Sequence, residues 1–132
     1  TKNFKAKIEN MFHSNVKNIF KNTEIHCSDF SDFFRKIKPT HNDFIFLDPP
    51  YDTDFSDYEG KSFTQNDHER LAYELKNTTA KFILVIKHTD FIKSLYEKDF
   101  YILSFDNQYI YNVRSRNNRN VEHLIITNLP IL

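Results

Sequence analysis

The residues best suited to chemistry are Asp48, Pro49, Pro50 and Tyr51, which follow an apolar run at residues 44–47 in the segment FIFLDPPY. A residue that precedes a proline is held in an extended conformation, so the Asp48 carboxylate and the Pro49 carbonyl become two stiffly placed hydrogen-bond acceptors. Tyr51 adds a flat aromatic face beside them. Together these groups suit a planar ligand that carries an amino substituent. The competing interpretation is a strand-end turn in which Asp48 caps a neighbouring segment and Tyr51 packs.

The position of this tetrapeptide in the chain supports a ligand site. Residues 44–47 form a short apolar run without alternation, which predicts a strand buried on both faces of a sheet. The two prolines can neither continue the strand ladder nor enter a helix interior, so the chain turns there. In an open α/β sheet, ligands bind just beyond the carboxyl ends of the strands. We therefore expect the site at this edge.

Helices and strands alternate along the rest of the chain. An apolar stripe at residues 3–20 predicts an amphipathic helix, residues 28–37 have a helical tendency with Ser28 or Asp29 as the cap, and Thr64 with Asp67 resembles a capping box for a helix that ends at Asn77. We expect a further short helix at residues 89–96, and strands at residues 23–27, 43–47, 81–87, 100–111 and 123–127. This order predicts an α/β fold with a mostly parallel sheet and an antiparallel C-terminal end.

Composition excludes several classes of protein. The 132 residues suffice for one domain with a core, and 18 basic residues balance 18 acidic ones, unlike a protein that coats polyanions. Cys27 is the only cysteine, which excludes an internal disulfide and fits a reducing cytosol. No apolar run reaches membrane-spanning length and no signal peptide is recognisable, so we expect a soluble, cytoplasmic protein without a membrane partner. Neither the histidines nor the acidic segment 52–59 has metal-ligand spacing, so we expect no metal.

The segment LDPPY resembles the catalytic motif of the Dam-like adenine-specific DNA methyltransferases. Three further stretches resemble the same family in the same order: IHCSDFSDF before the motif, and SFTQNDHERLAYEL and RSRNNRNVEHLIITN after it. LDPPY is the most specific of these, and the other stretches gain weight from their order and spacing. The resemblance implies a partial Rossmann-like methyltransferase fold. It also implies methyl transfer from S-adenosylmethionine to the exocyclic amino group of adenine in double-stranded DNA, by a bacterial or phage-encoded enzyme of the restriction-modification or phage type.

The resemblance assigns roles to individual residues. The catalytic residues would be Asp48, Pro49, Pro50 and Tyr51, with Tyr51 stacked on a target base that is flipped out of the duplex. Asp29 and Phe30, together with Asp48, would contact the cofactor. The alternative for Asp29 is a helix cap, and the alternative for Phe30 is a core position.

Basic residues elsewhere suggest contacts with DNA. Three arginines in the polar loop would contact DNA phosphates, although a merely solvated loop is the alternative; they are Arg114, Arg116 and Arg119. Lys87 and His88 end the expected strand at 81–87, where they either line the site or extend into solvent.

One departure from the family limits what the chain can do alone. Family members carry a glycine-rich loop that holds the cofactor, whereas the only glycine here is Gly60, downstream of the motif. We therefore interpret residues 1–132 as the C-terminal catalytic half of a methyltransferase domain, with residues 1–22 as the tail of its DNA-recognition insert and the N-terminal cofactor-binding part absent. The strand at 43–47 would then expose an apolar edge to the missing half or to a second copy. We expect the chain alone to bind S-adenosylmethionine weakly or not at all and to be inactive.

Other functions remain open at this point. The main alternative is a non-catalytic nucleic-acid-binding or assembly module of the same fold, favoured by the absent glycine loop and disfavoured by the complete DPPY motif. Methylation of RNA or of protein glutamine is a third reading, although related enzymes with those substrates usually carry asparagine where this chain has Asp48. A restriction nuclease is disfavoured, because we find no acid-x-Lys pair at a strand end with a partner acid.

Overall fold

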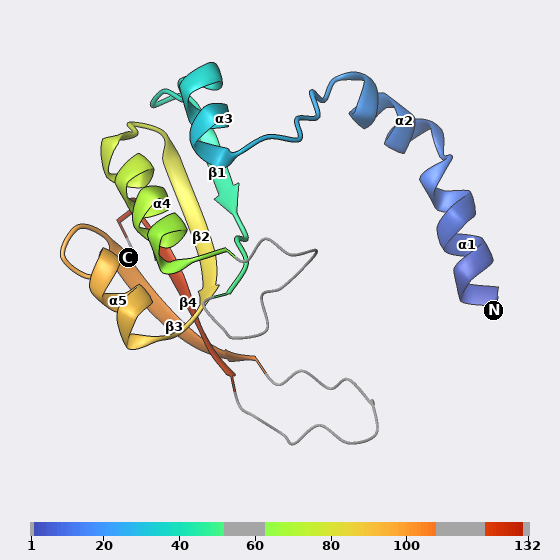
Figure 1. The fold of residues 1–132 in the computed structure, drawn as a ribbon. Coiled ribbons are helices and arrows are strands. Elements are labelled where there is room, and N and C mark those ends of the chain that lie inside the picture. Colours follow the sequence, from blue (N-terminus) through green and yellow to red (C-terminus); the bar gives the residue numbers. More distant parts are fainter. Residues whose placement is uncertain (1, 52–62, 108–120, 131–132) are drawn as a thin grey trace.

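The computed structural model describes residues 2–51, 63–107 and 121–130, which form an open sheet with helices (Figure 1). The α/β class expected from the sequence is confirmed. In chain order the elements are α1 (Lys2–Met11), α2 (Ser14–Lys21), α3 (Phe30–Ile37), β1 (Phe44–Leu47), α4 (Gln65–Asn77), β2 (Lys81–Lys87), α5 (Asp90–Tyr96), β3 (Tyr101–Asn107) and β4 (Val121–Thr127). Residues 108–111 of the strand expected at 100–111 lie outside the described residues.

The four described strands lie in the order β1-β2-β4-β3. β1 runs parallel to β2, whereas β4 is antiparallel to both of its neighbours, β2 and β3. The antiparallel C-terminal end is therefore confirmed, but the expectation of a mostly parallel sheet is wrong for these strands. The physical reason is that β4 pairs antiparallel with the strand before it and then inserts beside β2, so only the βαβ unit of β1, α4 and β2 gives a parallel pair.

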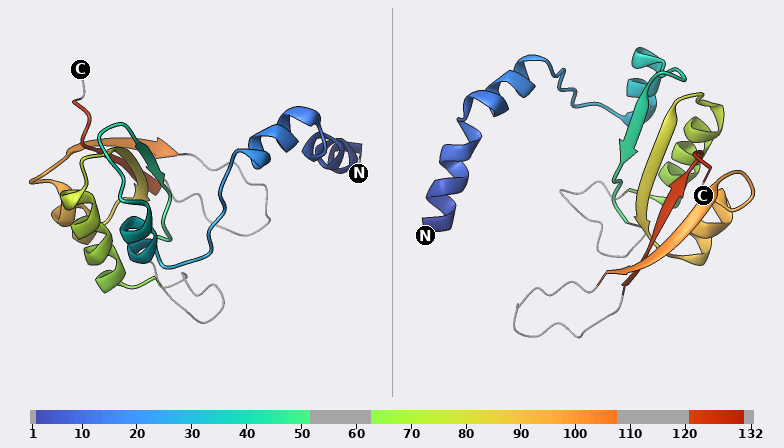
Figure 2. Two further views of the ribbon diagram at one scale, coloured as in Figure 1. Left: turned by 90° about the horizontal axis from the view of Figure 1, so that it is seen from above. Right: turned by 180° about the vertical axis from the view of Figure 1, so that it is seen from behind.

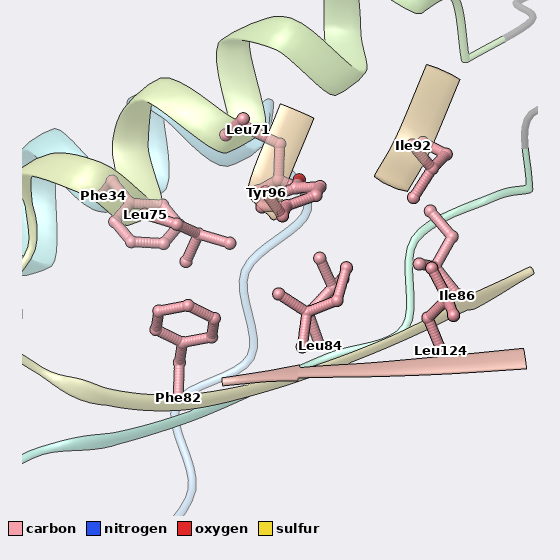
Figure 3. Packing of buried hydrophobic residues seen from close by; sticks show 11 residues of the cluster. Phe34, Leu71, Leu75, Phe82, Leu84, Ile86, Ile92, Tyr96 and Leu124 are labelled. Carbon is pink, nitrogen blue, oxygen red and sulfur yellow. The ribbon is translucent and has the colours of Figure 1, made fainter. Parts of the chain in front are cut away.

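The core lies between the sheet and three helices on one of its faces. Figures 1 and 2 show α3, α4 and α5 on the same side of the strands. The residues that fill this layer are buried: Phe34 of α3, Leu71 and Leu75 of α4, Ile92 and Tyr96 of α5, Phe82, Leu84 and Ile86 of β2, and Leu124 and Ile126 of β4 (Figure 3). Every second residue of β2 and β4 points into the core, as a strand with a period of two requires.

The opposite face of the sheet, called here the open face, carries apolar side chains that no described helix covers. Phe44 and Phe46 of β1 are 56% and 64% exposed, and Tyr101 and Leu103 of β3 are also exposed. The expectation that residues 44–47 are buried on both faces is therefore wrong. Only Ile45 and Leu47 pack against the core. β1 is also at the edge of the sheet among the described strands, so both this edge and the open face are left uncovered by the described elements.

Helix starts follow the capping residues expected from the sequence. Asp29 is the N-cap of α3, where its side chain accepts a hydrogen bond from the Ser31 amide at 2.8 Å. Thr64 and Asp67 form the capping box of α4, and that helix ends at Asn77 as expected. These caps satisfy backbone N–H groups that have no partner within the helix.

The N-terminal region differs from its expected form. The stripe at 3–20 forms two helices, α1 and α2, rather than one, because His13 caps a new helix by accepting from the Asn15 amide. Both helices extend away from the sheet (Figures 1 and 2), which leaves Phe12 and Phe20 exposed. The prediction of a strand at 23–27 is wrong, because these residues form neither a strand nor a helix. A strand exists only through pairing, and this segment pairs with none of the described strands, so Ile25 remains 75% exposed.

Candidate active site

The proline corner, residues 48–51, lies at the carboxyl edge of the only parallel pair among the described strands. Leu47 ends β1 opposite Leu84 of β2, and the chain then leaves the sheet at Asp48. Asp48 and Pro50 are exposed, while Pro49 and Tyr51 are half-buried. Both prolines keep the corner extended and prevent it from continuing the ladder. The corner therefore presents Asp48 at the edge where open α/β sheets bind ligands.

Tyr51 reaches across the sheet to β4. Its hydroxyl oxygen lies 3.2 Å from Nε2 of His123, and the centroids of the two rings are 5.5 Å apart with an edge-to-face arrangement. His123 pairs in register with Lys87 near the end of β2. Because β2 lies between β1 and β4, this contact folds the proline corner over the end of β2. The imidazole tautomer decides which of the two atoms donates the hydrogen bond.

A second aromatic ring supports His123 from the other neighbouring strand. Phe105 of β3 pairs in register with His123 and stacks on it, with centroids 5.5 Å apart and an angle of 28° between the rings. His123 is 1% exposed, although it lies on the otherwise open face. Tyr51, His123 and Phe105 thus form one aromatic cluster at the carboxyl edge. Sequence reasoning missed His123, because nothing in the segment VEHLIIT marks this residue before its partners are known.

His88 and Glu122 form a polar pair at the same edge. Nδ1 of His88 lies 2.6 Å from Oε2 of Glu122, and the His88 amide donates to the Glu122 carbonyl at 2.9 Å. The hydrogen bond from His88 is the main reason why the pKa of Glu122 lies below its usual range. Glu122 and His123 are adjacent in β4 and therefore point to opposite faces. The sequence left open whether His88 lines the site or extends into solvent, and the structure shows it at this edge in a pair with an acid.

Two of the three residues expected to contact the cofactor, Asp29 and Phe30, lie at the start of α3 and already have partners in the structure. The Asp29 carboxylate accepts hydrogen bonds from Nη1 and Nη2 of Arg70 at 3.2 and 3.0 Å. The guanidinium carbon of Arg70 also lies 4.6 Å from the centroid of the Phe30 ring. Hydrogen bonding to Arg70 is the largest cause of the lowered pKa of Asp29. Asp29 and Phe30 thus contact α4 through Arg70, whereas the proline corner contacts β4 through Tyr51 and His123.

Arg70 joins a second carboxylate to this group. Its Nη2 donates to Oδ1 of Asp67 at 2.7 Å, and this bond is the main reason why the pKa of Asp67 falls to about 2. Asp67 is also the acid of the capping box, so Arg70 connects the first turn of α4 with the N-cap of α3. Sequence reasoning missed Arg70 as well, because its partner Asp29 lies 41 positions away.

Comparison with known proteins then decides the family. A family model described as D12 class N6 adenine-specific DNA methyltransferase matches residues 1–111. The chain belongs to this family. The type II methyltransferase M.CviBI of Paramecium bursaria Chlorella virus NC1A is 37% identical over 124 residues, which are 91% of this chain and 46% of that protein. The chain therefore spans about half the length of this curated relative. The resemblance inferred from LDPPY is confirmed.

Some expected site residues of this D12-class chain lie outside the described residues. They are Arg114, Arg116 and Arg119, whose contacts with DNA phosphates remain a prediction. The acidic segment 52–59, for which no metal was expected, also lies outside the described residues. Within residues 2–51, 63–107 and 121–130, no group of three or more His, Cys, Asp or Glu side chains could hold a metal ion. In the same part of the chain, no helix has the length and apolar character needed to cross a bilayer.

Proposed function

We propose that this chain supplies the catalytic corner of an enzyme that methylates the exocyclic amino group of adenine in double-stranded DNA, with S-adenosylmethionine as the methyl donor. Membership of the D12 class supports the reaction type. The observation that carries the proposal is the position of Asp48: an exposed acid held by two prolines, at the carboxyl edge of a parallel strand pair. A type II restriction-modification setting is consistent with the name of the relative, a type II methyltransferase.

The proline corner offers groups that would make the adenine amino nitrogen a better nucleophile. The amino nitrogen of adenine is a poor nucleophile because its lone pair is delocalised into the ring. Asp48 and the Pro49 carbonyl would accept its two hydrogens and favour a pyramidal nitrogen with an available lone pair. The Asp48 charge would also stabilise the positive charge that develops on the amine. When bound, S-adenosylmethionine supplies the methyl group as an electrophile. This direct transfer needs no covalent enzyme intermediate, so the exposed Cys27 has no required role.

Tyr51 would hold the target base in place. An adenine inside the duplex cannot reach the corner, so the base must be flipped out of the stack. The half-buried Tyr51 ring lies three residues after Asp48 and offers an aromatic surface for stacking. Stacking of a base on an aromatic side chain contributes roughly 1–3 kcal/mol. Arg114, Arg116 and Arg119 would add phosphate contacts that orient the duplex without reading its sequence.

The start of α3 fits part of the cofactor. Phe30 is half-buried and has a ring able to cover an adenine, with the Arg70 guanidinium already against it. Asp29 is an exposed acid whose carboxylate binds Arg70 and the Ser31 amide. An ionised carboxylate has about four acceptor sites, so an adenine amino group would share Asp29 with these donors. We propose that Asp29 and Phe30 hold the adenine of S-adenosylmethionine and that Asp48 lies next to its methyl-bearing end.

The open face supports the proposal that the remainder of a methyltransferase domain packs here. Phe44, Phe46, Tyr101 and Leu103 expose apolar surface on one face, and β1 leaves one ladder edge unpaired by the described strands. We propose that residues 1–132 are the C-terminal catalytic half of a Rossmann-like domain, with residues 1–22 as the tail of a DNA-recognition insert. An N-terminal cofactor-binding half, or a second copy, would cover this surface. The isolated chain would then bind S-adenosylmethionine weakly and transfer no methyl group.

Labelled methyl transfer tests the proposal. The protein as encoded in its gene is incubated with S-adenosylmethionine labelled in the methyl group and DNA from a methylation-deficient host, and the DNA is then digested to nucleosides. We expect the label in N6-methyladenine, and no transfer above background by the isolated 132 residues. If the encoded protein binds this DNA but transfers no label, the non-catalytic nucleic-acid-binding module replaces the enzyme. Robust transfer by the isolated chain contradicts the incomplete-half proposal.

A further inference from the structure

We propose that His123 is a positioning residue for Tyr51: its buried imidazole holds the tyrosine hydroxyl and thereby fixes the plane of the ring against which the target base stacks. This inference rests on the proposed function, in which Tyr51 contacts the base. It goes further by assigning a role to a residue of β4, 72 positions away in the sequence. His123 itself would not touch the substrate.

A tyrosine ring needs such a restraint to act as a stacking surface. The ring turns about two side-chain torsions, and the χ2 torsion has a broad energy well. Its attachment to the backbone alone therefore leaves the ring plane loosely defined. The hydrogen bond to His123 holds the opposite end of the ring, at a distance of 3.2 Å between the hydroxyl oxygen and Nε2. With both ends held, the ring cannot swing away from the proline corner, and its orientation is set before a base arrives.

His123 lies at a position suited to serve as a fixed anchor. β4 is paired on both sides, with β2 and with β3, so the backbone of His123 belongs to an interior strand of the sheet. Phe105 stacks on the imidazole and Tyr51 contacts it edge to face. The residue is 1% exposed. A histidine that served only to make the open face soluble would be exposed, and His123 is not. A buried histidine needs polar partners, and the Tyr51 hydroxyl is one of them.

Paired substitutions separate positioning from simple packing. Tyr51→Phe keeps the stacking ring and removes the hydroxyl, and His123→Phe keeps an aromatic ring and removes the nitrogen. We expect each change to lower kcat for methyl transfer to DNA by about fivefold, the size of one net hydrogen bond. KM for S-adenosylmethionine should stay within about twofold, since neither residue is assigned to the cofactor. The double variant should be no slower than either single variant, because both remove the same bond.

Two further variants serve as rescue and control. His123→Gln keeps a side-chain amide that can reach the hydroxyl and should retain at least about half of the wild-type kcat. Tyr96→Phe removes another buried tyrosine hydroxyl, which has no hydrogen-bond partner within the described residues, and should leave kcat unchanged. All variants are made in the protein as encoded, and thermal unfolding is recorded for each. If His123→Phe fails to fold, Tyr51→Phe and His123→Gln still carry the test.

The outcomes distinguish this inference from the function on which it rests. An active wild-type protein whose His123→Phe or Tyr51→Phe variant is equally active contradicts the positioning role alone. Single losses that multiply in the double variant also contradict it, because they show that the two residues act independently. A folded wild-type protein that transfers no methyl group to DNA contradicts the proposed function and the role of His123 with it.

Discussion

Arg70 and Asp29 are joined by two hydrogen bonds, Nη1 to Oδ1 at 3.2 Å and Nη2 to Oδ2 at 3.0 Å, across 41 positions of sequence. The same guanidinium donates to Asp67 at 2.7 Å and lies over the Phe30 ring. One side chain therefore connects the N-cap of α3 with the capping box of α4. The residues that we assign to the cofactor thus also have a structural role, which is independent of any bound ligand.

This network predicts how stability depends on pH. The pKa of Asp67 is lowered to about 2, with Arg70 as the largest cause, and the pKa of Asp29 is lowered for the same reason. An unfolded aspartate has a pKa of about 3.9. The stabilisation is therefore fully present above this value and is lost as the pH falls through it toward about 2. Arg70→Gln should cost about 1 kcal/mol of unfolding free energy at pH 7, and the difference should shrink as the pH approaches 2.

Urea unfolding at a series of pH values checks this prediction. Arg35→Gln is the matched control, because the partner of Arg35 among the described residues is Asp32, three positions earlier, and Arg35 is more exposed than Arg70. The control should change the unfolding free energy by less than about 0.5 kcal/mol throughout. A difference between wild type and Arg70→Gln that stays constant from pH 7 to pH 2 would show that the network does not act through its carboxylates.

Tyr96 presents an unusual feature of the core. Its ring is fully buried between α5 and the sheet, and its hydroxyl has no hydrogen-bond partner within the described residues. Burial also raises the pKa of this phenol. A buried polar group without a partner costs about 1–3 kcal/mol, so Tyr96→Phe should raise the unfolding free energy by about 1 kcal/mol. Urea unfolding measures it, with Tyr73→Phe as an exposed control. A loss of stability would reveal that the Tyr96 hydroxyl has a partner.

The open face predicts that the chain associates with itself. Phe46 is 64% exposed on the edge strand β1. A lysine at such a position opposes edge-to-edge and face-to-face contacts. Phe46→Lys should therefore weaken self-association of the 132-residue chain at least about tenfold, or about 1.4 kcal/mol, as measured by sedimentation velocity. Tyr73→Lys is the matched control, since Tyr73 is 67% exposed but lies on α4. Equal effects of both substitutions would place the association elsewhere.

Features that depend on a few neighbouring residues could be predicted from the sequence. The capping box of Thr64 and Asp67 requires only residues three positions apart, and Asp29 caps α3 for the same local reason. The proline corner is equally local, because each proline restricts its own backbone and that of the preceding residue. The apolar runs in β2 and β4 also sufficed to predict both strands.

Features that depend on residues far apart in the sequence could not be predicted. The segment at 23–27 has residues typical of a strand but pairs with none of the described strands. The sequence pattern of a segment does not show whether a partner strand lies beside it. The exposure of Phe44 and Phe46 depends on whether another element covers the open face. The apolar run at 44–47 does not contain this information. Tyr51 and His123 meet across 72 positions, so their contact appears only once β4 inserts beside β2.

The catalytic role of Asp48 is tested most directly by the rate of methyl transfer to adenine in DNA by the encoded protein carrying Asp48→Ala. We expect a loss of at least about 100-fold in kcat, comparable to the removal of one group that stabilises a transition state, with DNA affinity changed less than about threefold. Asp90→Ala, at another exposed acid just beyond the end of β2, should leave both unchanged. Methyl transfer by Asp48→Ala at the wild-type rate would contradict the assignment of the proline corner as the catalytic site.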